Sequence, residues 1–152
     1  MQFGIVGALG RMGRAIAARA QSTGMQLTTP VEFAQHPDLG KSYRAVTGLG
    51  FEAEIVPLAK AKIPEGGLID FSHASTVIET LRKAAETAAP VVVGTTGFTP
   101  EQRQALESMA DKIPLIIASN MAIGVNVLFS RARRLQIVVG DLHGLNTLKH
   151  QP

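Results

Sequence analysis

The stretch GALGRMG at residues 7–13 places three glycines three residues apart, between an apolar run and a segment with helical spacing. Residues 2–6 predict a strand, and residues 11–22 predict a helix with Ile16, Ala17 and Ala20 on one face. At such a junction one glycine allows a tight turn, the second lets a diphosphate approach the main chain, and the third lets helix and strand pack closely. The free N–H groups of the helix N-terminus would then attract phosphate. The stretch favours a dinucleotide-binding turn over the alternative, a glycine-rich turn that serves packing only.

An acidic residue follows at the distance that such a turn requires. Residues 26–32 predict a second strand, and its last residue, Glu32, stands 22 residues beyond Gly10. In dinucleotide-binding folds, a carboxylate roughly 20 residues beyond the glycine turn accepts hydrogen bonds from the ribose hydroxyls of the bound dinucleotide. It would repel a 2′-phosphate unless an arginine lay nearby, and the next residue is Phe33. Glu32 therefore favours NAD over NADP; the alternative is a solvated residue at a strand end.

The rest of the chain alternates short β-branched runs with segments of helical spacing. Strands are predicted at residues 67–71, 91–93 and 115–118. Helices are predicted after residue 73, at about residues 100–111 and at about residues 125–136. Residues 33–50 predict a long loop with at most one helical turn. The inner face of the helix after residue 73 carries Val77, Ile78, Leu81, Ala84 and Ala85. Thr99, Pro100 and Gln102 predict a capping box at the next helix start. This pattern predicts an α/β fold, a Rossmann-like, doubly wound, mostly parallel sheet.

Composition narrows the class of protein. A chain of 152 residues with 45% hydrophobic and 18% charged residues fits one packed domain and excludes intrinsic disorder. The net charge is +3, and the one basic cluster, Arg131, Arg133 and Arg134, is typical of a solvated helix face, so we expect no nucleic-acid partner. The chain has no cysteine, which excludes disulfides and thiolate chemistry. Without a long apolar run or a charged leader, we expect a cytoplasmic protein that does not enter a membrane.

Two further segments follow predicted strands, where doubly wound sheets bind their ligands. They are GTTGF at residues 94–98 and ASNMAIGVN at residues 118–126. Their small and hydroxyl-bearing residues suit a nicotinamide ribose and carboxamide; the alternative is ordinary loop and capping chemistry. The four histidines have no metal-ligand spacing, so no metal site and no catalytic residue is predicted.

Taken together, GALGRMGR at 7–14, IDFS at 69–72, GTTGF at 94–98 and ASNMAIGVN at 118–126 resemble the 4-hydroxy-tetrahydrodipicolinate (dihydrodipicolinate) reductases, in order and spacing, over residues 1–141. The resemblance implies an oxidoreductase that transfers hydride from NADH or NADPH to a cyclic unsaturated dicarboxylate, in the diaminopimelate route to lysine. NAD(H) is favoured and NADP(H) possible, because members that accept NADP tend to carry an arginine where Phe33 stands.

The resemblance also implies which residues bind the cofactor. The diphosphate would lie against residues 7–12, and Glu32 would hold the adenosine ribose. The residues at the diphosphate are Gly7, Ala8, Leu9, Gly10, Arg11 and Met12. The nicotinamide end would be lined by Gly94, Thr95, Thr96, Ala118, Ser119, Asn120 and Met121.

The resemblance ends after Asp141. The family would continue there into a sheet with paired histidines, a lysine and a Ser-Gly-Thr stretch that binds the substrate, whereas residues 142–152 form a divergent tail. We therefore expect a single truncated domain, residues 1–141, that binds the dinucleotide, is inactive alone and does not form the family's homo-oligomer. The alternatives are a non-catalytic nucleotide-binding or interaction module, and a truncated product without function.

Overall fold

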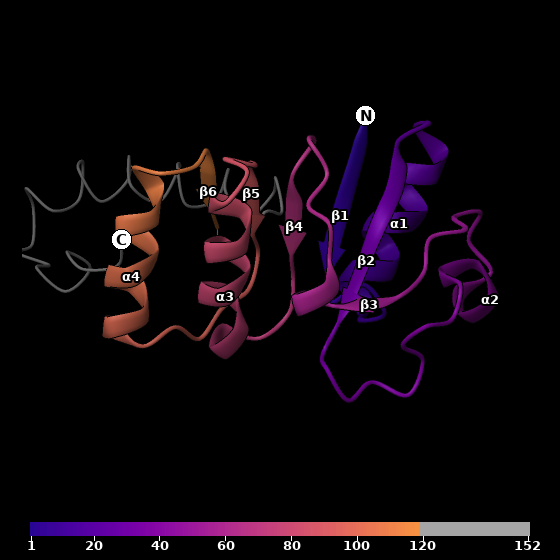
Figure 1. Ribbon diagram of the computed structural model, residues 1–152, viewed down its shortest axis with the longest axis horizontal. Helices are drawn as coiled ribbons and strands as arrows, with labels where there is room; N and C mark the ends of the chain where they lie inside the picture. Colours follow the sequence, from indigo (N-terminus) through magenta and orange to yellow (C-terminus); the bar gives the residue numbers. More distant parts are fainter. Residues whose placement is uncertain (119–152) are drawn as a thin grey trace, which may run out of the picture. The chain divides into compact units, whose positions relative to one another are not determined.

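The structure is a computed structural model that describes residues 1–118. These residues form a six-stranded, entirely parallel sheet of order β3-β2-β1-β4-β5-β6 (Figure 1). The strands are β1 (Gln2–Val6), β2 (Gln26–Glu32), β3 (Val56–Pro57), β4 (Leu68–Asp70), β5 (Val91–Val93) and β6 (Leu115–Ile117). The strand order reverses between β1 and β4, as the doubly wound Rossmann fold requires, so the predicted fold class is confirmed.

Helices connect the strands. They are α1 (Arg11–Ser22), α2 (Tyr43–Thr47), α3 (Ala74–Ala85) and α4 (Pro100–Ala110), with a 3₁₀ turn, η1, at Leu58–Lys60. In this part of the chain no helix is long and apolar enough to cross a membrane. The predicted helix at residues 125–136 and the predicted boundary at residue 141 lie outside the described residues.

Two hydrophobic clusters form, one for each group of helices. In the first, Val77 and Leu81 of α3 and Leu106 of α4 pack with residues of β4 and β5. In the second, Ala17 of α1 and Tyr43 of α2 pack with residues of β1 and β2. Successive side chains of a strand point to opposite faces, which is why Phe3 and Ile5 of β1 belong to the second cluster and Val6 to the first. In Figure 1, α3 and α4 lie beside one another at one end of the sheet and α1 and α2 lie at the other.

The observed elements differ from the predicted ones at their edges. The strand expected at residues 67–71 is shorter because Gly67 has a φ of 86°, which extended backbone excludes. β3 and η1 were not predicted, since a two-residue strand carries no detectable alternation. The single helical turn expected within residues 33–50 is α2, which ends at Gly48 with a φ of 77°.

The predicted capping box at α4 is confirmed, and it fixes the loop that enters this helix. The Gln102 N–H donates to the Thr99 hydroxyl (3.3 Å), and the Thr99 N–H donates to the Gln102 side-chain oxygen (2.9 Å). The side-chain nitrogen of Gln102, Nε2, donates to the carbonyl of Ala74 (3.2 Å), at the start of α3. The loops that enter α3 and α4 at the carboxyl ends of the strands are therefore tied together.

Candidate functional site

The three glycines of the first turn have three different steric roles. Gly7 has a φ of 80°, and a Cβ there would meet the Phe71 carbonyl at 2.7 Å. A Cβ at Gly13 would collide with the Gly7 carbonyl oxygen and with the backbone of Ala8. A Cβ at Gly10 would meet only the Gly7 carbonyl oxygen, at 3.2 Å. Gly7 therefore permits the turn, Gly13 permits α1 to pack on it, and Gly10 leaves space on the outer side of the main chain.

The N–H groups inside the turn all have acceptors within the protein. Gly7 and Ala8 donate to the Val31 carbonyl at 3.0 and 3.1 Å, and Gly10 donates to the Gly7 carbonyl at 3.1 Å. The N–H of Leu9 donates to Oε1 of Glu32 at 2.7 Å. The carboxylate that the sequence assigned to a ribose therefore also supports the turn, and it is half-buried rather than fully solvated.

Two side chains hold the carbonyl groups of the same turn. The hydroxyl of Tyr43 donates to the Ala8 carbonyl (2.9 Å), and Nε of Arg14 donates to the Leu9 carbonyl (2.9 Å). Burial is the main cause that raises the pKa of Tyr43 to about 12; the positive charge of Arg14 opposes the rise and the negative charge of Glu32 adds to it. The hydroxyl therefore stays protonated, and remains a donor, throughout the neutral range.

The first turn of α1 presents its N–H groups without acceptors. Gly10 is the N-cap and has no side chain that could accept from these N–H groups. The helical hydrogen bonds of α1 begin with the N–H of Arg14, which donates to the Gly10 carbonyl at 3.0 Å. Within residues 1–118, the N–H groups of Arg11, Met12 and Gly13 have no hydrogen-bond partner. Three adjacent free donors at a helix N-terminus form a site suited to a phosphate group.

A cavity of about 500 Å³ adjoins this turn at the carboxyl ends of β1, β2 and β3. Its lining includes Gly7 and Glu32, Pro57 of β3 with Leu58 and Ala59 of η1, and, from the loop after β4 and from α3, Ser72, His73, Thr76 and Glu79. The exposed ring of Phe33 also lines it and makes an edge-on contact with the His36 ring, with centroids 5.0 Å apart. The cavity thus combines a carboxylate with apolar surface, which suits a sugar joined to a flat aromatic base.

A buried polar cluster joins the loops after β4 and β5. Asp70, which is fully buried, accepts at Oδ1 from the N–H (2.9 Å) and the hydroxyl (2.6 Å) of Ser72 and from the hydroxyl of Thr95 (3.1 Å). Its second oxygen, Oδ2, is buried and has no donor among the described residues. The ring of Phe71 packs against Gly94 so closely that a Cβ there would overlap it. Asp70 therefore fixes two loops relative to one another at the edge of the sheet.

The residues predicted for the nicotinamide end fall into two groups. Gly94 and Thr95 are at least partly buried in the loop after β5, and Thr96 is exposed there. Ala118 follows β6, and its N–H donates to the Val93 carbonyl at 3.0 Å. The fold thus brings these four residues to the same edge of the sheet as the glycine turn and Glu32. Ser119, Asn120 and Met121 lie outside the described residues.

The sequence analysis did not identify three residues whose side chains support the site through hydrogen bonds. Tyr43 is separated from Ala8 by 35 residues, and no local pattern announces the contact. The sequence does indicate Asp70, because a carboxylate within the otherwise apolar run GLIDF needs hydrogen-bond partners when it is buried. Arg14 directly follows the third glycine, and nothing in the motif indicates its hydrogen bond to the Leu9 carbonyl.

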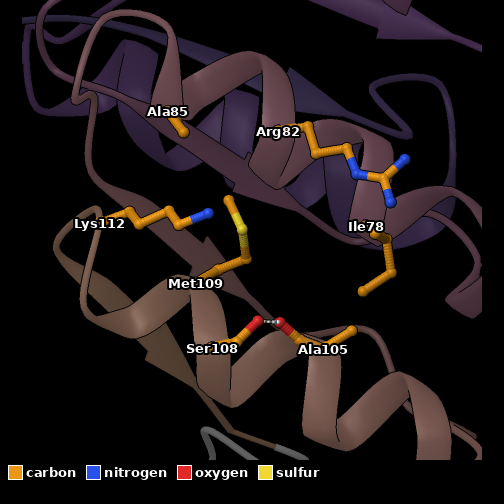
Figure 2. Close-up of a pocket in the computed structure, with 7 residues that line it drawn as sticks. All are labelled: Ile78, Arg82, Ala85, Ala105, Ser108, Met109 and Lys112. Atoms are coloured by element: carbon orange, nitrogen blue, oxygen red, sulfur yellow. Dashed lines mark hydrogen bonds between the residues drawn. The ribbon is translucent and has the colours of Figure 1, made fainter.

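A second hollow, of about 330 Å³, lies between α3 and α4, away from the carboxyl ends of the strands (Figure 2). In Figure 2, Met109 extends from α4 toward α3, and Ile78 and Ala85 of α3 lie across the gap. The hydroxyl of Ser108 is taken by the Ala105 carbonyl at 2.7 Å. Arg82 and Lys112 also line this groove, but it lies apart from the carboxyl ends of the strands and is not part of the candidate site.

Comparison with known proteins identifies related chains. The family model described as "Dihydrodipicolinate reductase, N-terminus" matches residues 1–121. A 4-hydroxy-tetrahydrodipicolinate reductase of Syntrophotalea carbinolica is 34% identical over 147 residues, which are 93% of this chain and 54% of the relative. One from Methanococcus maripaludis (strain C7) is 33% identical over 150 residues, 93% of this chain and 56% of the relative. The chain therefore spans about half the length of the curated relatives it matches.

Solved structures show the same fold. The dipicolinate-bound dihydrodipicolinate reductase of Paenisporosarcina sp. TG-14 superimposes with a TM-score of 0.62 at 23% identity, covering 90% of this chain and 53% of that one. The family match extends over the glycine turn, Glu32, the Asp70 cluster and the loop after β5, so it includes every described part of the candidate site. Residues 1–121 match the N-terminal part of the family's proteins, and the chain belongs to the dihydrodipicolinate reductase family.

Proposed function

We propose that this chain binds a nicotinamide dinucleotide along the carboxyl ends of its strands, as the cofactor-binding part of a reductase. The observation that carries the proposal is the triad of N–H groups of Arg11, Met12 and Gly13, which have no acceptor within residues 1–118, beside a carboxylate at the end of β2. The triad would bind the diphosphate, and the second oxygen of Glu32 would accept a ribose hydroxyl. The residues present therefore fit the dinucleotide.

The reaction that we propose for the whole enzyme is hydride transfer to a cyclic unsaturated dicarboxylate in the route to lysine. Reduced nicotinamide supplies the hydride when bound. This chain would hold the nicotinamide ring between the loops after β4 and β5, which Asp70 joins through hydrogen bonds to Ser72 and Thr95.

The 152 residues by themselves would give negligible turnover. They span about half of each relative named as a reductase, so groups that the relatives carry in their other half are not among these 152 residues. Positioning of a substrate against the cofactor can lower a barrier by roughly 7–11 kcal/mol, and that contribution needs both partners to be held. A folded protein that binds no dinucleotide at all would instead favour an interaction module.

The first prediction is that NADH binds more tightly than NADPH, by about tenfold or more. The negative charge of Glu32 would lie beside a 2′-phosphate, and Phe33 offers no compensating cation. Isothermal titration with both cofactors measures the ratio of dissociation constants. In Glu32→Gln, which keeps an oxygen acceptor but removes the charge, the ratio should fall toward one. Equal affinities of the unaltered protein for both cofactors would contradict the charge argument.

The second prediction is that Gly10→Ala weakens NADH binding by about a hundredfold or more while the melting temperature changes little. The added methyl group meets only the Gly7 carbonyl, at 3.2 Å, and Gly10 has extended backbone angles (φ −66°, ψ 167°) that alanine adopts freely. On the outer side it would occupy the space that the diphosphate needs. Calorimetric titration and thermal melting measure the two effects.

Gly50→Ala is the matched control for this variant. It also adds one methyl group at an exposed glycine, where the nearest atom of the protein is Oε1 of Gln21 at 3.4 Å, an ordinary contact. Gly50→Ala should bind NADH as the unaltered protein does. If Gly10→Ala bound NADH equally well, the diphosphate could not lie on this turn, and the proposed site would be wrong.

A further inference from the structure

The peptide unit between Ala8 and Leu9 is held at both of its polar ends by side chains. Its carbonyl accepts from the Tyr43 hydroxyl at 2.9 Å, and its N–H donates to Oε1 of Glu32 at 2.7 Å. The neighbouring units are held mainly by backbone groups, through the Val31 and Gly7 carbonyls. The orientation of this one peptide therefore depends on Tyr43 and Glu32 together.

Tyr43 is anchored independently of its hydroxyl. It begins α2, its side chain is fully buried, and it belongs to the cluster that contains Phe3, Phe51 and Ile55. Its N–H donates to the Ala53 carbonyl at 2.8 Å. The long segment between β2 and β3 thus brings one hydroxyl to the back of the glycine turn and holds it rigidly there. Removing that hydroxyl alone would leave the ring packed.

Without this hydroxyl the Ala8 carbonyl would be buried without a donor. A buried carbonyl in that state gains free energy by rotating toward water or another donor, and the Leu9 N–H turns with it because both belong to one planar unit. Glu32 would then lose the contact that fixes one of its oxygens. Because that oxygen is bonded to the turn, the other is left to face the cavity in a defined direction.

We propose that Tyr43 is a positioning residue for dinucleotide binding, which acts through the Ala8–Leu9 peptide to aim the Glu32 carboxylate at the ribose. The inference rests on the proposed function, because it concerns the affinity for that ligand. It assigns a role to the segment between β2 and β3, which makes no other hydrogen bond to the glycine turn among the described residues.

The test is a double-mutant cycle measured by calorimetric titration with NADH. Tyr43→Phe should weaken binding by about tenfold, and Glu32→Ala by more, since it removes the ribose acceptor itself. The double variant should bind as Glu32→Ala does, because no carboxylate is left to orient. Thr29→Val is the matched control: it also deletes a buried hydroxyl that donates to a backbone carbonyl, that of Lys62 at 2.9 Å, and it should bind NADH normally.

The outcomes separate the two proposals. If the unaltered protein does not bind NADH, the proposed function fails and this inference fails with it. If the unaltered protein binds, but Tyr43→Phe binds equally well or weakens binding by the same factor with and without Glu32, only the positioning role is overturned.

A second measurement covers the case in which Tyr43→Phe does not fold. Tyr43 is the only tyrosine of the chain, so growth on a fluorinated tyrosine changes this phenol alone: fluorine replaces hydrogen on the ring, and the hydroxyl stays in place. Fluorination lowers the pKa of a phenol, and an ionised Tyr43 cannot donate to Ala8. The alkaline loss of NADH affinity should therefore shift to lower pH in the fluorinated protein. An unshifted profile would overturn the role of the hydroxyl.

Discussion

Gly13→Ala is expected to lower the free energy of unfolding by about 3 kcal/mol or more, enough to unfold much of a marginally stable domain. A Cβ at this position would overlap the Gly7 carbonyl oxygen and the backbone of Ala8. Neither atom can yield, because the Gly7 carbonyl accepts from Gly10 and the Ala8 N–H donates to Val31. The strain would have to be relieved by moving α1 away from the sheet.

Chemical denaturation followed by circular dichroism measures this loss. Gly10→Ala is the informative comparison, because it makes the same change three residues earlier, where the added Cβ meets a single atom at 3.2 Å. The two variants should separate stability from binding: Gly13→Ala loses the fold, and Gly10→Ala keeps the fold and loses the ligand. Equal stability of the two proteins would contradict the close packing at Gly13.

Asp70→Ala is expected to destabilise the protein by about 4 kcal/mol. One oxygen of Asp70 accepts from the Ser72 N–H, the Ser72 hydroxyl and the Thr95 hydroxyl, and its removal leaves those donors without their acceptor in a buried site. Each unsatisfied donor costs about 1–3 kcal/mol. The loops after β4 and β5 would also lose their only shared carboxylate among the described residues, so NADH binding should weaken as well.

Asp70→Asn distinguishes lost hydrogen bonds from lost charge. Its side-chain oxygen can replace Oδ1 and accept from the same donors, while its NH₂ group takes the place of Oδ2, which has no donor in the described part of the chain. We expect Asp70→Asn to lose about 1 kcal/mol in urea denaturation, well below the loss in Asp70→Ala. If asparagine were as damaging as alanine, the negative charge itself, and not the three hydrogen bonds, would hold the loops.

The parts of this fold that could be predicted from sequence are those fixed by neighbouring residues. The glycine spacing specifies the turn because each steric role depends on atoms within six residues or on an adjacent strand. The Thr99 capping box is readable for the same reason, since both of its hydrogen bonds span three residues. Glu32 could be assigned to the turn because its distance from the glycines follows from the length of one helix and one strand.

What could not be predicted depends on contacts between distant segments. Tyr43 lies in a stretch whose proline and glycines predict a loop with at most one helical turn, and its partner is 35 residues away. Asp70 meets Thr95 across 25 residues, a pairing that requires β4 and β5 to be adjacent in the sheet. β3 consists of two residues and is defined by its pairing with β2 rather than by a pattern of its own. In each case the sequence supplies the residue, and only the fold supplies its partner.

The hydrogen bonds that hold the glycine turn have a consequence for kinetics. Since its peptide units are already oriented by Val31, Glu32, Tyr43 and Arg14, the turn has little conformational freedom to lose when an anion binds. Association would then proceed in a single step whose rate rises linearly with ligand concentration, without a slow rearrangement, and differences in affinity among variants would appear mostly in the rate of release.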